Sequence, residues 1–243
     1  MRDLLFMARS FFFLMDIENF SMMMAGRGKK SEYGKLLGIA LIIFIVFLSI
    51  AQLVFPGGYS PFDFSISTQG GMADNPPGWY FFTIGVAISG LLIIPVVNFC
   101  FENLPPHPGL LVKAGRFFSL IGMVGFIFVG LIPHDYAAPH NLAANIAFGG
   151  LGFGAFLVFV LLLVQMKRGI SNKPKWAIVV MFGPIIVIGI LSGLASLYAE
   201  LLPTSPFDNR FANYPIWQWS SMISLLIYIA AFFFFTKERP KDA

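Results

Sequence analysis

The residues best suited to chemistry lie in one short segment, residues 133–141, which reads Pro-His-Asp-Tyr-Ala-Ala-Pro-His-Asn. This segment holds His134, Asp135 and His140, and so two of the three histidines in the chain. Imidazole titrates near neutral pH, so it can act as a general acid or base and as a metal ligand. The segment is therefore the first candidate for a catalytic site or a metal site.

One hypothesis is a divalent metal bound by His134, His140 and Asp135, with Asp63 or Asp208 from other loops as a further ligand. Imidazole and carboxylate groups bind zinc and similar ions, and an open coordination position would hold a water for hydrolysis. The spacing matches no established zinc motif. The pattern therefore leaves the identity of any cofactor open.

A second hypothesis needs no metal. His140 would act as general base or acid, oriented by Asp135 or Asp63, and Ser65 or Ser67 would be the nucleophile. This arrangement would suit hydrolysis or acyl transfer.

A third reading of the same residues is purely structural. In it His140 and Asn141 cap a helix, Asp135 stabilises a turn, and His134 faces water. Clusters of titratable groups occur in structural roles as well as in active sites. The sequence leaves the three readings open.

The elements that position these residues are membrane helices. The chain has 243 residues, of which 57% are hydrophobic and only 12% are charged, whereas about a quarter of a typical soluble domain is charged. A spanning helix needs about 20 mostly apolar residues. Six segments qualify, which predicts an all-α integral membrane bundle of three hairpins: residues 36–55, 79–99, 110–132, 142–166, 176–201 and 216–235.

The positions of the basic residues predict the topology of the six helices, because cytoplasmic loops retain Lys and Arg. Fifteen of the 16 Lys and Arg residues lie at the termini or after the second and fourth helices. Both termini are therefore expected to be cytoplasmic, and residues 133–141 to lie on the outer face. The net charge of +4 follows from this asymmetry, and we expect no nucleic-acid partner.

Three regions are expected along the chain: a basic N-terminal segment at 1–35, a transmembrane domain at 36–236 and a basic cytoplasmic tail at 237–243. The first segment is an interfacial helix in one reading. In the other, translation starts at Met22, Met23 or Met24, and the preceding residues are absent from the protein.

Two hairpins share a short repeat. Ser-Pro-Phe-Asp occurs at residues 60–63 and 205–208, and Asn-x-Pro-x-Trp follows at 75–79 and 213–217. The repeat relates the first two helices to the last two, although turn and cap chemistry alone also favours these residue types. It places Trp79 and Trp217 at the headgroup level, where tryptophan is enriched, and we expect both to contact lipid.

The interior of the expected bundle is poor in polar groups. The sequence places no Lys or Arg in the middle of a spanning segment, which disfavours proton-coupled transporters and voltage sensors. The fourth segment is rich in small residues, among them Gly150 and Gly154, which allow close helix packing. We expect this segment to be the packing axis of the bundle.

Several short motifs resemble a known group of membrane proteins. They are Tyr-Ser-Pro at 59–61, Ile-Ser at 66–67, Gly-Met-Val-Gly at 122–125 and Gly-Leu-Ile-Pro at 130–133, with His140 opening the next helix. They resemble the uncharacterised prokaryotic family known as domain of unknown function nine-nine-eight, which is related to the Frag1, DRAM and Sfk1 superfamily. The resemblance implies a helical bundle in a lipid-related setting, and among functional positions it carries over only Ser67, Pro133 and His140.

The preferred functional prediction is a membrane protein that engages lipid through an outer polar cleft lined by the first, third and fifth loops, with hydrolysis or acyl transfer at His140 as its chemistry. The lipid-binding residues would include Arg210, His134 and Asp208. Because Arg210 is the sole basic residue in these loops, a neutral or zwitterionic headgroup, or one bridged by a metal, fits best. The alternatives are a scaffold that binds a membrane-protein partner or a second copy of itself, and a small-solute transporter.

Overall fold

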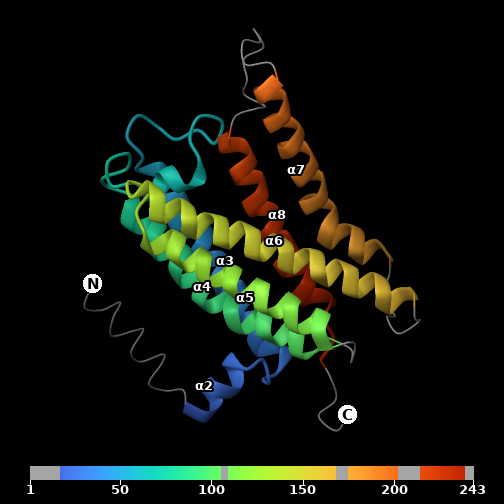
Figure 1. Ribbon diagram of the computed structural model, residues 1–243. Helices are drawn as coiled ribbons and strands as arrows, with labels where there is room; N and C mark the ends of the chain where they lie inside the picture. The colour runs from blue at the N-terminus through green and yellow to red at the C-terminus, as the bar shows by residue number, and fades with distance from the viewer. Residues whose placement is uncertain (1–16, 105–108, 168–174, 202–213, 239–243) are drawn as a thin grey trace.

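The computed structural model describes residues 17–104, 109–167, 175–201 and 214–238, and these residues form helices joined by turns, without a strand (Figure 1). A short 3₁₀ helix, η1 (Ile66–Gly70), interrupts the first long loop. The α-helices are α2 (Ile17–Met24), α3 (Lys30–Leu53), α4 (Trp79–Glu102), α5 (Gly109–Leu131), α6 (Ala137–Lys167), α7 (Lys175–Leu201) and α8 (Tyr214–Phe235).

Each of the six apolar segments coincides with a helix, α3 to α8 in order, although the first runs two residues past the end of α3 and the third one residue past the end of α5. Five of these helices, α3 to α6 and residues Pro215–Phe235 of α8, are long and apolar enough to cross a membrane. In α7, Ile178–Leu191 forms a shorter apolar stretch. The prediction of an all-α, multi-pass membrane protein is therefore confirmed for the described residues.

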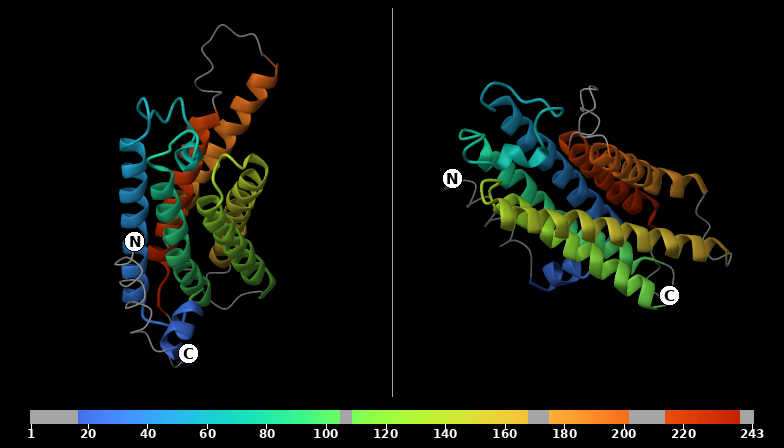
Figure 2. Two further views of the ribbon diagram at one scale, coloured as in Figure 1. Left: turned by 90° about the vertical axis from the view of Figure 1, so that its left-hand side faces the viewer. Right: turned by 45° about the horizontal axis from the view of Figure 1, so that its top comes forward.

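Helices that follow one another in the chain pack side by side. α3 packs on α4, α4 on α5, α5 most extensively on α6, and α7 on α8, whereas α6 meets α7 and α8 over small areas. Figure 2 shows α5 and α6 running together and α7 lying along α8. Aromatic side chains fill the core between layers, as where Phe44 of α3 meets Phe126 of α5 at a ring-centroid distance of 6.1 Å.

The small residues of α6 pack directly on the backbone of α5. A Cβ atom added to Gly150 would lie 2.7 Å from the Cα atom of Gly122, and one added to Gly154 would lie 2.9 Å from the backbone N of Ser119. Because only glycine permits such an approach, these residues bring the two helices into close contact. The predicted close packing at Gly150 and Gly154 is confirmed, and the partner is α5; with α7 and α8 the contacts of α6 are small.

The bundle has two chemically different ends. At one, which we call the basic end, Lys30 at the start of α3 donates from Nζ to the carbonyl oxygens of Phe234, in the last turn of α8, and of Thr236, just after it, at 3.0 and 2.6 Å. There Arg116 of α5 also pairs with Glu102 of α4. The opposite end carries η1 and the α5–α6 turn, and we call it the η1 end.

The N-terminal segment joins the bundle at the basic end. Asn98 Nδ2 of α4 donates to the carbonyl oxygen of Met24 at 2.8 Å. Gly26, with φ of +81°, packs so closely on α4 that an added Cβ would lie 2.6 Å from the carbonyl carbon of Asn98. α3 begins at Lys30, so the predicted boundary at residue 35 falls inside a helix. The choice between an interfacial helix and a later start stays a prediction.

Candidate functional site

At the η1 end, the α5–α6 turn is tied to the loop that follows η1. The backbone N–H of His134 donates to the carbonyl oxygen of Gly70 at 3.2 Å. The Asp135 carboxylate accepts from the backbone N–H groups of Ala73, at 2.9 Å, and of Met72. The predicted first and third outer loops are therefore in contact.

The electrostatics of Asp135 follow from these hydrogen bonds. Burial acts to raise the pKa of this carboxyl, but the N–H groups of Ala73 and Met72 stabilise the ionised form and lower the pKa overall. Asp135 thus holds a turn, as the structural reading of the sequence predicts. Its carboxylate oxygens bond to the η1 loop and not to His140 among the described residues.

His140 is 1% exposed and lies in the first turn of α6. The helix begins at Ala137, earlier than predicted, because Pro139 can occupy a first turn, where backbone N–H groups have no helical partner. The prediction that His140 and Asn141 cap the helix is therefore wrong.

The ring of His140 has one nitrogen engaged and one not. Its Nδ1 lies 2.7 Å from the carbonyl oxygen of Ile132. Because a carbonyl only accepts, Nδ1 carries the proton in the neutral ring, and the lone pair is on Nε2. Nε2 is buried and has no hydrogen-bond partner within the described residues.

His134 and His140 lie together, as the sequence predicts. Their rings meet edge to face with centroids 5.4 Å apart, and His134 Nδ1 lies 3.5 Å from an oxygen of Asp74. Within the described residues, no group of three or more His, Cys, Asp or Glu side chains could hold a metal ion. A metal would need a ligand from elsewhere, and because Asp208 lies outside the described residues, the metal site stays a prediction.

Ser67 belongs to a different set of contacts. Its side chain is buried in η1, where its Oγ atom lies 3.1 Å from Ser65 Oγ, and its backbone N–H donates to Gln218 Oε1 of α8 at 3.4 Å. Asp63 is exposed in the preceding turn. In the part of the chain that the structure describes, no hydrogen bond joins His140 to Ser67 or Asp63, so catalysis by these residues stays a prediction.

The predicted lipid-contacting residues are placed in part. Trp79 and Trp217 lie half-buried in the first turns of α4 and α8. Both turns are at the η1 end, as expected for residues of one membrane interface. Arg210, Asp208 and the second copy of the Ser-Pro-Phe-Asp repeat lie outside the described residues.

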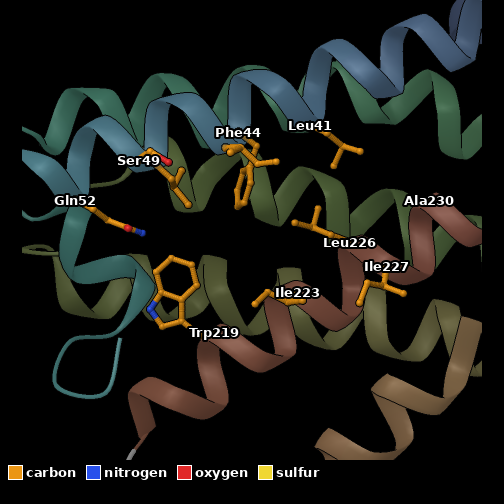
Figure 3. Close-up of a pocket in the computed structure, with 11 residues that line it drawn as sticks. Leu41, Phe44, Ser49, Gln52, Trp219, Ile223, Leu226, Ile227 and Ala230 are labelled. Carbon is orange, nitrogen blue, oxygen red and sulfur yellow. The ribbon is translucent and has the colours of Figure 1, made fainter. Parts of the chain in front are cut away.

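A groove of 410 Å³, which the sequence does not predict, lies between α3 and α8 (Figure 3). The lining residues recur at helical spacing over twelve residues of each helix. Gln52 alone among the lining residues has a signal in the sequence, as a polar residue near the end of an apolar segment. The lining residues are Leu41, Phe44, Ile45, Leu48, Ser49 and Gln52 of α3, and Trp219, Ile223, Leu226, Ile227 and Ala230 of α8.

The polar groups of the groove gather at its η1 end, where Ser49 and Gln52 face Trp219 (Figure 3). Trp219 Nε1 donates to the hydroxyl of Tyr59 at 2.7 Å. That hydroxyl lies 3.0 Å from the carbonyl oxygens of both Phe64 and Ser65. The first loop therefore fixes the ring that closes this end of the groove.

Tyr59 stays neutral at physiological pH, because burial raises the pKa of its hydroxyl to about 12. The neutral hydroxyl has one proton for a carbonyl oxygen and lone pairs for the indole N–H of Trp219. The Tyr59 hydroxyl and the Trp219 N–H are thus both hydrogen-bonded, and the position of Trp219 does not depend on pH near neutrality.

A family model described as Protein of unknown function (DUF998) matches residues 38–235. The chain belongs to the DUF998 family. The match runs from the third turn of α3 to the last residue of α8, so both walls of the groove and the α5–α6 turn lie within it. No curated protein and no solved structure matches the chain.

The groove of this DUF998 protein is open along its side. Ile45 and Ile223, one on each wall, are 61% and 50% exposed. None of the eleven lining residues is charged. Neither the Ser49 hydroxyl nor the Gln52 amide has a hydrogen-bond partner among the described residues. The groove therefore combines a long apolar surface with free hydrogen-bonding groups at one end.

Proposed function

We propose that this DUF998 protein is a six-helix membrane protein with cytoplasmic termini that binds a membrane lipid in the groove between α3 and α8. Support for the topology comes from the charges: Lys30, Arg116 and Lys237 lie at the basic end, and cytoplasmic segments retain such residues. With 27 residues, α7 is long enough to be the sixth crossing.

The observation that carries the proposal is the distribution of polarity in the groove. Apolar side chains line it from Leu41 to Leu48 on one wall and from Ile223 to Ala230 on the other, and the polar groups lie only beyond them, at the η1 end. A lipid has the same distribution, with an apolar chain and a polar head. The open side would admit it directly from the bilayer.

This proposal keeps the predicted lipid interaction but moves it from the His140 cleft to the groove. The first loop contributes in both versions, through Tyr59 here. Burial of an acyl chain against the two walls is favourable by about 0.8 kcal/mol for each methylene group removed from water. For a chain that leaves the bilayer the free energy gained is smaller, because the chain exchanges contacts with lipid tails for contacts with the groove. Hydrogen bonds at the polar end and the fit in the groove must therefore supply selectivity.

The test compares two substitutions of the same kind on α3. Ile45 lines the groove and is 61% exposed, whereas Ile42 is 63% exposed and lies outside it. Native mass spectrometry of the detergent-purified protein, titrated with lipid, measures the apparent Kd. Ile45→Trp should weaken binding by about tenfold, the loss of about 1.4 kcal/mol of chain contact. Ile42→Trp should bind like the wild type.

Equal lipid binding in the wild type and both variants would refute lipid binding in the groove. A dimer mass that Ile45→Trp abolishes would instead identify the groove as an interface between two copies, the alternative predicted partner.

A further inference from the structure

The dimensions of the groove decide what it can hold. From Leu41 to Gln52, α3 rises about 17 Å at 1.5 Å per residue, and the lined part of α8 has the same length. Dividing the volume of 410 Å³ by this length leaves a cross-section of about 24 Å², or about 5 Å across. A helix with its side chains is about 10–12 Å wide, so the groove does not enclose one.

The length of the groove also matches the thickness of one leaflet of a bilayer. The hydrocarbon core of a bilayer is about 30 Å thick, so one leaflet contributes about 15 Å, close to the length of the groove. The lined part of α3 ends one residue before the helix does, and that of α8 begins five residues after its first residue. The lined part of α3 therefore lies in the half of that helix at the η1 end, whereas that of α8 also ends five residues before the helix does and spans its middle.

The polar end offers hydrogen bonds without charge. The Gln52 amide supplies both donors and an acceptor, and the Ser49 hydroxyl supplies one donor and lone pairs. Trp219 lines the same end, but its N–H is engaged with Tyr59. None of the lining residues that the structure describes is cationic, so these residues provide no partner for a phosphate, which arginine and lysine normally bind.

We infer that the ligand is an uncharged acylglycerol, with one acyl chain along the groove and its glycerol hydroxyl and ester groups at Ser49 and Gln52, drawn from the leaflet at the η1 end. This inference rests on the proposed function, because it specifies the lipid that the groove takes. An uncharged head leaves no buried charge unpaired beside the apolar walls, whereas a phosphate there would lose its hydration without gaining a cation.

Quenching of Trp219 fluorescence by brominated acyl chains tests both the binding of a chain in the groove and the preference for an uncharged headgroup. The full chain, with Trp79, Trp176 and Trp217 replaced by Phe, is placed in phosphatidylcholine nanodiscs. Two probes carry the same dibromostearoyl chain, one as its monoacylglycerol and the other as its anionic lysophosphatidic acid. The expected result is saturable quenching by the monoacylglycerol at a concentration about tenfold lower than by the anionic probe, because the phosphate would lose hydration without gaining a cation.

Two variants examine the polar end. Gln52→Leu should raise the midpoint for the monoacylglycerol about tenfold and leave the anionic probe unchanged, while Gln52→Asn, which retains an amide, should keep the preference. Saturable quenching by both probes at the same midpoint, with no effect of Gln52→Leu, would overturn the headgroup assignment and leave lipid binding intact. Absence of saturable quenching by either probe would overturn lipid binding in the groove itself.

Discussion

Substitution of Gly150 by alanine should destabilise the bundle far more than the same change at Gly149, its neighbour on α6. A Cβ atom at Gly150 would lie 2.7 Å from both the Cα and the N atom of Gly122 and 2.9 Å from the carbonyl oxygen of Phe118. Carbon atoms pack best at about 3.5–4.0 Å, so α5 and α6 would have to separate by about 1 Å at this point.

The cost follows from that separation. A gap of up to about 1 Å forfeits a quarter to a half of the contact energy of the atoms it separates, and overpacking costs about 1–3 kcal/mol. All the crowded atoms are backbone, which cannot turn aside as a side chain can. We therefore expect Gly150→Ala to lower the free energy of unfolding by about 3 kcal/mol, at the upper end of the range.

Gly149 provides the matched control, because a Cβ added there meets no atom within 4 Å. Alanine is favoured over glycine inside a helix by about 0.5–1 kcal/mol, so Gly149→Ala should leave stability unchanged or raise it. Equilibrium unfolding in mixed micelles, followed by circular dichroism, measures both. Equal losses at the two positions, or no loss at Gly150, would refute the close packing of α5 on α6.

Three further predictions concern side chains that make hydrogen bonds. Tyr59→Phe removes the acceptor for the Trp219 N–H, so it should lower the free energy of unfolding by about 1 kcal/mol and shift the Trp219 emission. Tyr80→Phe, at an exposed position, should do neither. An unchanged Trp219 emission in Tyr59→Phe would contradict the contact. Asp135→Asn should lower the thermal midpoint at pH 7. Because folding lowers the pKa of the Asp135 carboxyl, its contribution to stability is present above the ordinary pKa of 3.8 and is lost as the pH falls through the folded-state pKa. A difference from the wild type that persists in acid would argue against this. Ser89→Ala deletes a buried hydrogen bond of 2.8 Å to the Ala40 carbonyl oxygen of α3. It should lower the free energy of unfolding by about 0.6 kcal/mol, and by about 1.7 kcal/mol at most. A stabilised variant would show that the bond contributes nothing.

The sequence predicts the helices well, because the physical requirement is local. A segment that crosses a bilayer must satisfy its own backbone hydrogen bonds and be apolar along its whole length, so all six segments coincide with helices. The clustering of His134 and His140 is also predictable, since six residues separate them across one turn. The contact of Gly150 with α5 follows from glycine content and from the short connection between neighbouring helices.

Only the tertiary structure decides the groove and the environment of His140. In a spanning helix the faces toward lipid and toward the core are both apolar, so the sequence pattern does not reveal how each helix is rotated. The groove depends on that rotation for two helices, α3 and α8, whose lining residues Gln52 and Trp219 are far apart in the chain. The sequence alone therefore determines which segments are helices and which end of the bundle is basic, and the packing of distant helices determines which polar groups are left free to bind a ligand.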